Sequence, residues 1–148
     1  MDGLTLLMED HDRFKDMLKR GEDTSERERA TRVQLFDDLK RQLEAHERME
    51  EEVLYPALKE HPRTKEIVLE GYEEHHVADV ILEEIADTDP EDERWAAKWK
   101  VLKENIEHHI EEEEGDMFPK ARKIFDRDEL AALGAAMDQI RTESLVRR

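Results

Sequence analysis

The chain has 148 residues, of which 37% are hydrophobic and 44% are charged, and its formal net charge is −17. Such an acidic surface repels phosphates, so we expect no nucleic-acid partner and no anionic membrane surface. The sequence has no cysteine, which excludes disulfides, thiolate zinc sites, Cys-ligated iron–sulfur clusters and cysteine nucleophiles. The length predicts one domain over residues 1–148, with a core bundle over about 1–120.

The beginning of the chain carries no targeting pattern. Residues 1–10 have neither a basic segment nor a long apolar run, and no apolar stretch in the chain reaches 18 residues. A secretory signal peptide and a transmembrane helix both need such a stretch. We therefore expect no membrane association and a cytoplasmic location.

Apolar residues recur at helical spacing in the first third of the chain. A first helix is predicted to end near Gly21, and Leu4, Leu7, Met8, His11, Phe14, Met17 and Leu18 follow its helical spacing. A second helix is predicted to be capped by Thr24 or Ser25. Proline lacks the amide hydrogen, so Pro56 is expected to end or kink this helix and to bias Tyr55 away from helical geometry. The inner face of the second helix is Val33, Phe36, Leu39, Leu43, His46 and Glu50.

Helical periodicity continues through the rest of the chain, and no segment alternates with period two over a useful length. A third helix is predicted from about Thr64 to Ala86, with a stripe of Ile67, Val68, Tyr72, Ile81, Leu82 and Ile85. Asp89 is expected to cap a fourth helix, with Pro90 in its first turn. The inner face of that helix is Trp95, Trp99, Leu102, Ile106, His109 and Glu113, and Pro119 breaks it.

A shorter fifth helix is expected at about residues 128–143, with Leu130, Leu133, Met137 and Ile140 as its apolar residues. The four longer helices are joined by short loops. Short loops between helices favour an antiparallel arrangement of neighbours. The sequence therefore predicts an all-α fold, an antiparallel four-helix bundle with an additional short C-terminal helix.

One phrase occurs twice in the chain: His-x-x-x-Glu, four residues, an aromatic residue and proline. The two copies run from His46 to Pro56 and from His109 to Pro119. Residues four apart on a helix lie on one face, about 6 Å apart along the axis, so each copy aims an imidazole and a carboxylate in the same direction. Two such pairs facing each other supply two nitrogens and two oxygens to one interior point. This pattern favours a metal site, and a two-metal site over a one-metal site.

Two pairs of adjacent histidines require a choice of helical phase. His75 continues a buried apolar stripe of the third helix, whereas His76 continues a poorer one. His109 lies ten residues before its proline, as His46 does, whereas His108 is displaced by roughly 100° around the helix. We therefore predict that His75 and His109 point inward and that His76 and His108 do not.

With His11, the prediction is one inward histidine from each of four helices and one inward glutamate from two of them. The candidate metal ligands are His11, His46, Glu50, His75, His109 and Glu113. Imidazole with carboxylate suits iron, manganese or zinc, and shared carboxylates suit a dinuclear site. The His-Glu-x-x-His motif of zinc proteases is not met, because its last position is Glu50. The Glu-x-x-His motif of ferritin-like bundles is met only by Glu73 and His76.

At these residues the chain resembles bacterial hemerythrin-like proteins of the hemerythrin/HHE cation-binding family. The resemblance covers roughly residues 1–125 and rests on the order His, His-x-x-x-Glu, His, His-x-x-x-Glu with the flanking aromatic residues and prolines. It implies an up-down-up-down bundle around a non-haem di-iron centre, with two Fe ions joined by an oxo or hydroxo group. It also implies that both glutamates bridge the irons. One iron then takes His11 and His46, and the other takes His75 and His109.

The third helix departs from the oxygen-carrying hemerythrins, which have a fifth histidine paired at i,i+4 there. The positions four from His75 are Gly71 and Asp79. We expect that Asp79 or water fills the position, or that it is open to a small ligand. Glu47 is an additional ligand candidate. Tyr72 either lines the pocket, where it hydrogen-bonds bound oxygen or peroxide, or is a core aromatic residue.

The resemblance implies a protein that binds O₂ or a related small oxidant, such as peroxide or nitric oxide. Two alternatives stay open: a small enzyme that turns over peroxide or nitric oxide, and a protein for iron buffering or storage. The expected partner is a small diatomic ligand or peroxide, and the expected oligomeric state is a monomer or a homodimer. Nothing in the sequence marks an organic substrate.

Overall fold

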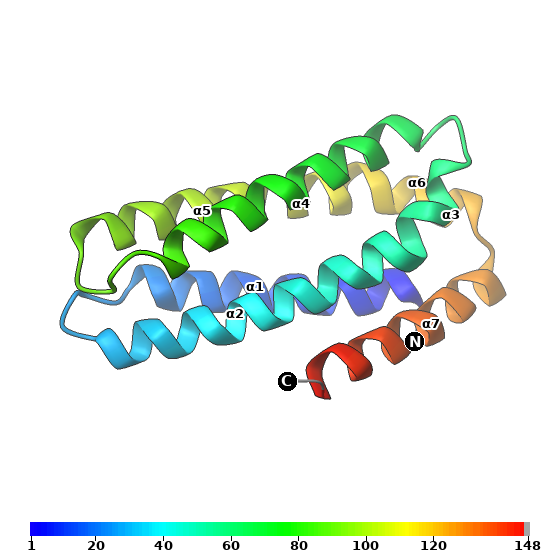
Figure 1. Cartoon of the computed structure of the whole chain (residues 1–148). Helices are drawn as coiled ribbons and strands as arrows, with labels where there is room; N and C mark the ends of the chain where they lie inside the picture. Colours follow the sequence, from blue (N-terminus) through cyan, green and yellow to red (C-terminus); the bar gives the residue numbers. More distant parts are fainter. Residues whose placement is uncertain (147–148) are drawn as a thin grey trace.

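The computed structural model describes residues 1–146, in which four long helices run alternately up and down side by side (Figure 1). These helices are α1 (Gly3–Glu22), α2 (Arg29–Met49), α4 (Lys65–Ala86) and α5 (Glu93–Glu112). Within residues 1–146 there is no β-strand, so the all-α, up-down-up-down prediction is confirmed. Over the same residues, the structure contains no helix with the length and apolarity needed to cross a membrane.

The two prolines of the repeated phrase do not end their helices. Helix α2 continues through a π-helical segment, η1 (Glu50–Leu54), into α3 (Tyr55–Lys59). Helix α5 continues in the same way through η2 (Glu113–Met117) into α6 (Phe118–Ile124). The wider π turn moves the preceding carbonyls away from the proline ring, so the helix passes the proline without a break.

Tyr55 is helical, with φ −61° and ψ −44°, so the expectation that it leaves helical geometry is wrong. Its amide donates to the carbonyl of Glu50, five residues earlier. The amide of Phe118 donates to the carbonyl of Glu113 in the same way. Each π segment therefore begins at a glutamate of the repeated phrase and ends beside its aromatic residue.

Helix α2 begins further along the chain than the predicted caps, Thr24 and Ser25, would place it. Its first residue is Arg29, and neither Thr24 nor Ser25 caps it. The Thr24 hydroxyl instead donates to the Gly21 carbonyl at 2.6 Å and accepts from the Arg32 guanidinium at 2.9 Å. These contacts stabilise the loop between α1 and α2 rather than the start of α2.

The cap of α5 is Asp92 and not Asp89. The Asp92 side chain accepts a hydrogen bond from the amide of Arg94 at 2.8 Å. Asp89 accepts from the amide of Glu91 at 2.8 Å and from the guanidinium of Arg29 at 2.7 Å. Asp89 therefore closes the turn that contains Pro90 and ties that turn to the start of α2.

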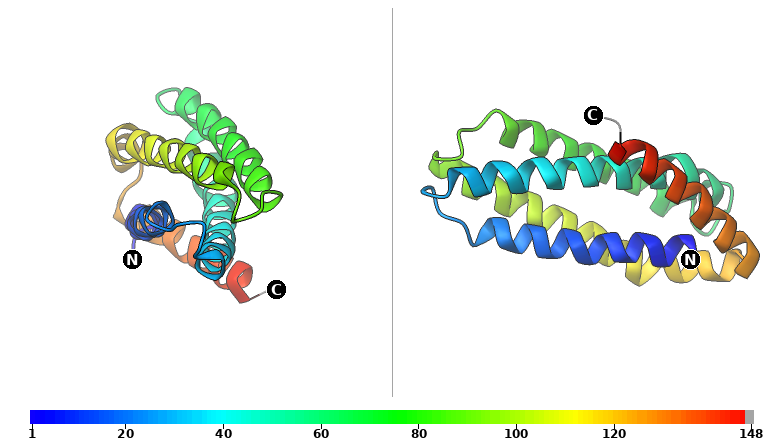
Figure 2. Two further views of the ribbon diagram at one scale, coloured as in Figure 1. Left: turned by 90° about the vertical axis from the view of Figure 1, so that its left-hand side faces the viewer. Right: turned by 90° about the horizontal axis from the view of Figure 1, so that it is seen from below.

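The C-terminal helix α7 (Arg127–Val146) has 20 residues and is not the short helix predicted from the sequence. It lies outside the four-helix bundle, against α1 and α2 (Figure 2). Its contacts with the bundle include Leu130 and Met137, which are buried. Helix α7 also crosses the start of the chain closely, because a Cβ atom at Gly134 would overlap the Met1 carbonyl oxygen.

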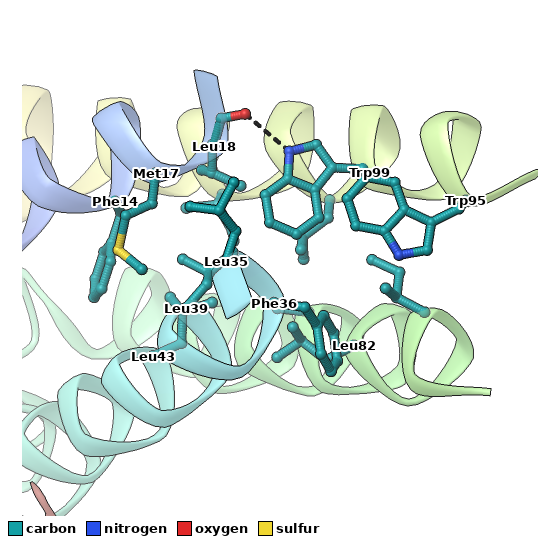
Figure 3. Close-up of a cluster of buried hydrophobic side chains, with 14 of the residues drawn as sticks. Phe14, Met17, Leu18, Leu35, Phe36, Leu39, Leu43, Leu82, Trp95 and Trp99 are labelled. Atoms are coloured by element: carbon teal, nitrogen blue, oxygen red, sulfur yellow. Dashed lines mark hydrogen bonds between the residues drawn. The ribbon is translucent and has the colours of Figure 1, made fainter. Parts of the chain in front are cut away.

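The end of the bundle near the α1–α2 and α4–α5 loops contains one apolar cluster, which we call the tryptophan cluster. Its buried members include Phe14, Met17, Leu18, Leu35, Phe36, Leu39, Leu43, Leu82, Trp95, Trp99, Leu102 and Ile106 (Figure 3). The Trp95 and Trp99 rings stack with centroids 4.9 Å apart, and Trp99 Nε1 donates to the Leu18 carbonyl at 2.8 Å. Val33 is exposed, so its predicted place on the inner face of α2 is wrong.

The opposite end of the bundle contains a second apolar cluster, which we call the proline-end cluster. Its buried members include Leu4, Leu7, Met49, Leu54, Tyr55, Leu58, Val68, Met117, Phe118, Leu130 and Met137. Ile67 and Tyr72 of the predicted α4 stripe are only partly buried against it. Between the two clusters each long helix presents polar side chains to the interior.

Candidate metal centre

The layer between the two apolar clusters holds all six candidate ligands. His11 lies between Leu7 and Phe14 on α1, so it sits at the boundary of the proline-end and tryptophan clusters. The other histidines occupy the same level on α2, α4 and α5. Five of the six side chains are at most 5% exposed, and His109 is 12% exposed. They are His11, His46, Glu50, His75, His109 and Glu113.

The ligand atoms of these side chains form two groups in which every atom lies within 4.8 Å of the others. The first group is His11, His46, Glu50 and Glu113, and the second is Glu50, His75 and His109. Glu50 belongs to both groups. The oxygens of Glu113 lie 3.1 Å from His11 Nε2 and 3.2 Å from His109 Nε2. Both carboxylates therefore lie between the two histidine pairs.

The neighbouring histidines lie outside the layer. His76 is exposed on α4, whereas His75 is buried. His108 is exposed on α5, and its Nε2 lies 2.7 Å from an oxygen of Glu112. One residue of helix turns the side chain by about 100°, which is the difference between the interior and the surface at both positions.

Each of the four inner imidazoles hydrogen-bonds an acidic side chain through Nδ1. The pairs are His11–Glu114 at 2.6 Å, His46–Asp10 at 2.8 Å, His75–Glu51 at 2.7 Å and His109–Glu74 at 2.5 Å. An ionised carboxylate only accepts hydrogen bonds, so Nδ1 carries the hydrogen in each pair. Each Nε2 consequently faces the centre, and the carboxylate fixes the ring, as acidic partners do for metal-binding histidines.

These four acidic partners were missed by reasoning from the sequence. Asp10 and Glu74 directly precede the inner histidines of α1 and α4, and each bonds the histidine of the next long helix. Glu51 and Glu114 directly follow the inner glutamates and bond histidines of the other half of the bundle. The available signal was that both halves of the chain place an acid at these same offsets.

One oxygen of the centre lacks a partner. Glu50 Oε2 is buried and has no hydrogen-bond partner among the residues that the structure describes. A buried acceptor left unpaired costs about 1–3 kcal/mol, and more when it is charged. A cation between the histidine pairs would satisfy it. The donor set of imidazole nitrogens and carboxylate oxygens suits iron, manganese or zinc.

Acidic neighbours favour the charged forms of three inner histidines, His46, His75 and His109, whose pKa values are all raised. Burial lowers the pKa of His46, but the charge of Glu50 and hydrogen bonds to Asp10 and Glu50 outweigh it and raise this pKa to about 9. The same opposition between burial and acidic partners raises the pKa of His75 to about 10. Burial raises the pKa of Glu50, yet the charge of His46 and several hydrogen bonds hold that pKa well below its usual value.

Tyr55 reaches into the centre, although the sequence predicted no role for it. Its hydroxyl donates to Glu113 Oε2 at 2.8 Å and lies 3.4 Å from Glu50 Oε1. The same oxygen lies 3.4 Å and 3.5 Å from the Nε2 atoms of His75 and His109. Burial, followed by the charges of Glu113 and Glu50, raises the pKa of Tyr55 well above its usual value.

The two halves of the centre differ at the aromatic residue of the repeated phrase. The Tyr55 ring stacks on His75 with centroids 5.4 Å apart, and the Phe118 ring stacks on His11 at 5.8 Å. The His75–His109 side therefore has a hydroxyl group beside its histidines, whereas the aromatic residue on the His11–His46 side is only hydrocarbon. This asymmetry makes the His75–His109 side of the centre the more polar one.

The ring of Tyr55 occupies the space beside Gly71. A Cβ atom at Gly71 would lie 2.7 Å from the Tyr55 hydroxyl oxygen, so only glycine allows this placement. Asp79 is exposed and belongs to neither ligand group, which favours the other two alternatives for the missing histidine position, water or an open site. Tyr72 packs edge-on against Tyr55 with ring centroids 5.1 Å apart.

A small cavity adjoins the four histidines on the side of the tryptophan cluster. Its volume is about 20 Å³, room for about one water-sized molecule, and Phe14, Leu43, Ala78 and Ile106 are among its lining residues. Glu47 also lines it but belongs to neither ligand group. Burial raises the pKa of Glu47 to about 9, and Asp79 contributes to this shift.

Known proteins share the family and the fold of this chain. The family described as the Hemerythrin HHE cation binding domain matches residues 2–121. A similar solved structure is that of a hemerythrin HHE cation binding domain-containing protein from Mycobacterium kansasii, a homologue of Rv2633c. Its TM-score is 0.83 at 26% sequence identity, over 99% of this chain and 91% of that chain. No curated protein matches the sequence significantly. The chain therefore belongs to the hemerythrin HHE cation-binding family and carries a metal-binding centre in an all-α bundle.

Proposed function

We propose that this protein holds two iron ions in the centre and binds O₂ or a related small oxidant, such as peroxide or nitric oxide. The observation that carries the proposal is the position of Glu50. This carboxylate belongs to both ligand groups, and one of its buried oxygens lacks a partner. A carboxylate shared by two groups of ligands suits two ions better than one.

The proposed ligands divide into two sets. His11 and His46 would hold one iron, His75 and His109 would hold the other, and Glu50 and Glu113 would serve both. Bound iron supplies redox chemistry towards small oxidants. The four carboxylates at the Nδ1 atoms keep each ring turned so that its Nε2 faces the centre. The apolar clusters on either side exclude bulk water from it.

The size of the cavity supports a small ligand rather than an organic substrate. A space of about 20 Å³ lined by the four histidines admits a diatomic molecule or peroxide and little more. The Tyr55 hydroxyl supports turnover of peroxide as a second candidate function. It is a buried proton donor among the ligand atoms, within 3.5 Å of two histidine nitrogens.

The test of the proposal is the metal content of the purified protein, with an optical spectrum before and after exposure to O₂, peroxide and nitric oxide. We expect about two iron ions per chain and a spectrum that responds to at least one of these molecules. One tightly bound zinc and no iron, after expression with ample iron, would overturn the proposal. Bound iron that ignores all three molecules would indicate storage instead.

A matched pair of variants tests the shared carboxylate. Glu50→Gln should lose both irons, because one oxygen pair serves two ions. Glu52→Gln is the control, since Glu52 lies two residues away on the surface and pairs with Arg48 at 2.7 Å. Full iron content in Glu50→Gln would show that this residue does not bridge the ions. Loss of peroxide consumption in Tyr55→Phe with iron retained would favour the enzymatic candidate.

A further inference from the structure

The acidic partner of His46 differs from the other three partners of the centre. Asp10 is 3% exposed, whereas the other three acids are 21–39% exposed. Two arginines donate to Asp10: Arg13, which lies one turn further along α1, and Arg141, which comes from α7. Neither arginine contacts any other acidic side chain of the centre within the described part of the chain.

The two oxygens of Asp10 have separate partners. Arg13 and Arg141 both donate to Oδ1, while His46 Nδ1 donates to Oδ2 at 2.8 Å. Rotation of the carboxylate would exchange the two oxygens, so the arginines on Oδ1 hold Oδ2 in line with the imidazole. On the other side of the ring, His46 Nε2 lies 3.5 Å from Glu50 Oε1. A continuous chain of contacts therefore runs from α7 to the ligand atoms.

Arg141 constrains the position of Asp10 more than Arg13 does. Arg13 is 46% exposed and belongs to the same helix as Asp10, and such exposed local pairs contribute little. Arg141 is 19% exposed and approaches from another helix. It therefore fixes the position of Asp10 relative to a second element of the fold.

Helix α7 is docked independently of Arg141. Leu130 and Met137 bury its apolar face in the proline-end cluster. The Arg48 guanidinium of α2 donates to the Ser144 hydroxyl at 2.6 Å near its end. The helix also begins after residue 121, where the match to the cation-binding family ends. Arg141 therefore lies outside the residues that the family matches.

We propose that Arg141 is a positioning residue of the metal centre, which acts through Asp10 to fix the imidazole of His46. Helix α7 is then part of the support of the centre and not only a cover for the bundle. The inference rests on the cation site within the proposed function, but it does not require that the cation is iron.

The first test uses cobalt(II), whose visible absorption reports its coordination, in titrations of the metal-free protein. Loss of an outer partner of a ligand histidine typically weakens metal binding by 10–100-fold. Because Arg13 remains, we expect Arg141→Ala to lower the affinity for one of the two cobalt ions by about tenfold, at the lower end of that range. Arg141→Lys, which keeps a cationic donor, should recover most of that loss. A cobalt affinity unchanged in Arg141→Ala would overturn the proposal.

Ser144→Ala is the matched control. Ser144 lies on the same helix and contributes to its docking, but it does not touch Asp10. If Arg141→Ala and Ser144→Ala weaken cobalt binding equally, Arg141 has only a structural role and the proposal is wrong. Should Arg141→Ala fail to fold, Arg141→Gln replaces it in the same comparison, because it keeps an aliphatic stem and one amide donor.

The second test needs no metal and separates this inference from the proposed function. Solvent exchange of the His46 Nδ1 hydrogen can be followed by NMR in the metal-free protein. We expect faster exchange in Arg141→Ala and exchange as in the wild type in Ser144→Ala. Equal exchange in all three proteins would overturn the positioning role. A wild-type protein that binds cobalt but not iron would contradict the proposed iron centre but would not contradict the positioning role of Arg141.

Discussion

Both ring nitrogens of the inner histidines face carboxylates. His46 has Asp10 at 2.8 Å on Nδ1 and Glu50 at 3.5 Å on Nε2, and His75 has Glu51 at 2.7 Å and Glu50 at 2.9 Å. In the metal-free protein these contacts favour the doubly protonated ring. A cation that takes Nε2 must displace one of the two protons.

This competition predicts how metal binding depends on pH. The pKa of His46 rises from 6.5 to about 9 and that of His75 to about 10, so folding of the metal-free protein gains from their protonation. That stabilisation is complete below pH 6.5 and is lost as the pH rises through 9 to 10. The apparent metal affinity should rise over the same window, because fewer protons compete.

Metal titrations against a chelator between pH 6.5 and 9.5, with urea unfolding of the metal-free protein at each pH, check this expectation. The metal affinity should increase while the free energy of unfolding of the metal-free protein decreases. An affinity that is flat across the window would show that the two imidazoles bind metal without losing a proton.

At the scale of elements, the π segments decide which side chains meet in the centre. Tyr55 lies five residues after Glu50, and in a regular α-helix such residues do not share a face. The i to i−5 hydrogen bond of η1 inserts one residue into the turn and brings Tyr55 towards the ligand atoms. Helix α4 completes the arrangement, because Gly71 leaves room for the phenol ring.

Gly71→Ala should therefore destabilise the protein. The new Cβ atom would lie 2.7 Å from the Tyr55 hydroxyl oxygen and 2.9 Å from Cζ, and both atoms belong to a rigid buried ring. Overpacking of this kind costs about 1–3 kcal/mol. Displacement of Tyr55 should also change the spectrum of the loaded centre. Urea unfolding and the optical spectrum measure the two effects.

Gly115→Ala provides the control, since a Cβ atom there would meet nothing within 4 Å. Glycine within a helix is less stable than alanine by roughly 0.5–1 kcal/mol, so this variant should be as stable as the wild type or more stable. If the two variants unfold at the same urea concentration, Tyr55 does not occupy the space beside Gly71.

At the scale of the whole molecule, a polar layer divides the core into two apolar clusters. Four imidazoles and two glutamates lie in this layer, where unpaired charges are costly. Ion pairs among these groups satisfy most of them in the metal-free protein, but Glu50 Oε2 stays without a partner. A cation would therefore connect all four long helices through groups that are otherwise imperfectly paired.

The metal-loaded protein should consequently melt at a higher temperature than the metal-free protein. Free metal at a thousand times its Kd adds about 4 kcal/mol of stability. In a protein of this size each kcal/mol raises Tm by about 2–4 °C, so we expect a rise of about 10 °C. Calorimetry with iron(II) under anaerobic conditions measures it. Magnesium is the control cation, because it prefers oxygen ligands and water. Equal Tm values with and without iron(II) would show that metal binding at the centre does not stabilise the folded protein.

The sequence by itself determined the helices, their approximate order and the inward phase of the histidines. These are local properties, because the 3.6-residue period places His75 inside whenever Val68 and Leu82 are inside. The repeated His-x-x-x-Glu phrase and the resemblance to the family are also properties of the sequence alone. Exceptions such as the exposed Val33 arose where a single apolar residue lies at the margin of a helix face.

Only the tertiary structure decided which side chains surround the ligands. The contact between Asp10 and Arg141 joins residues 131 positions apart, and it depends on how α7 docks on α1 and α2. The position of Tyr55 depends on the wider π-helical turn of η1 and on Gly71 in α4, which has no side chain to occupy the space of the phenol ring. Residue periodicity encodes neither, because it describes the faces of regular helices and not the packing of one helix against another or an inserted π turn.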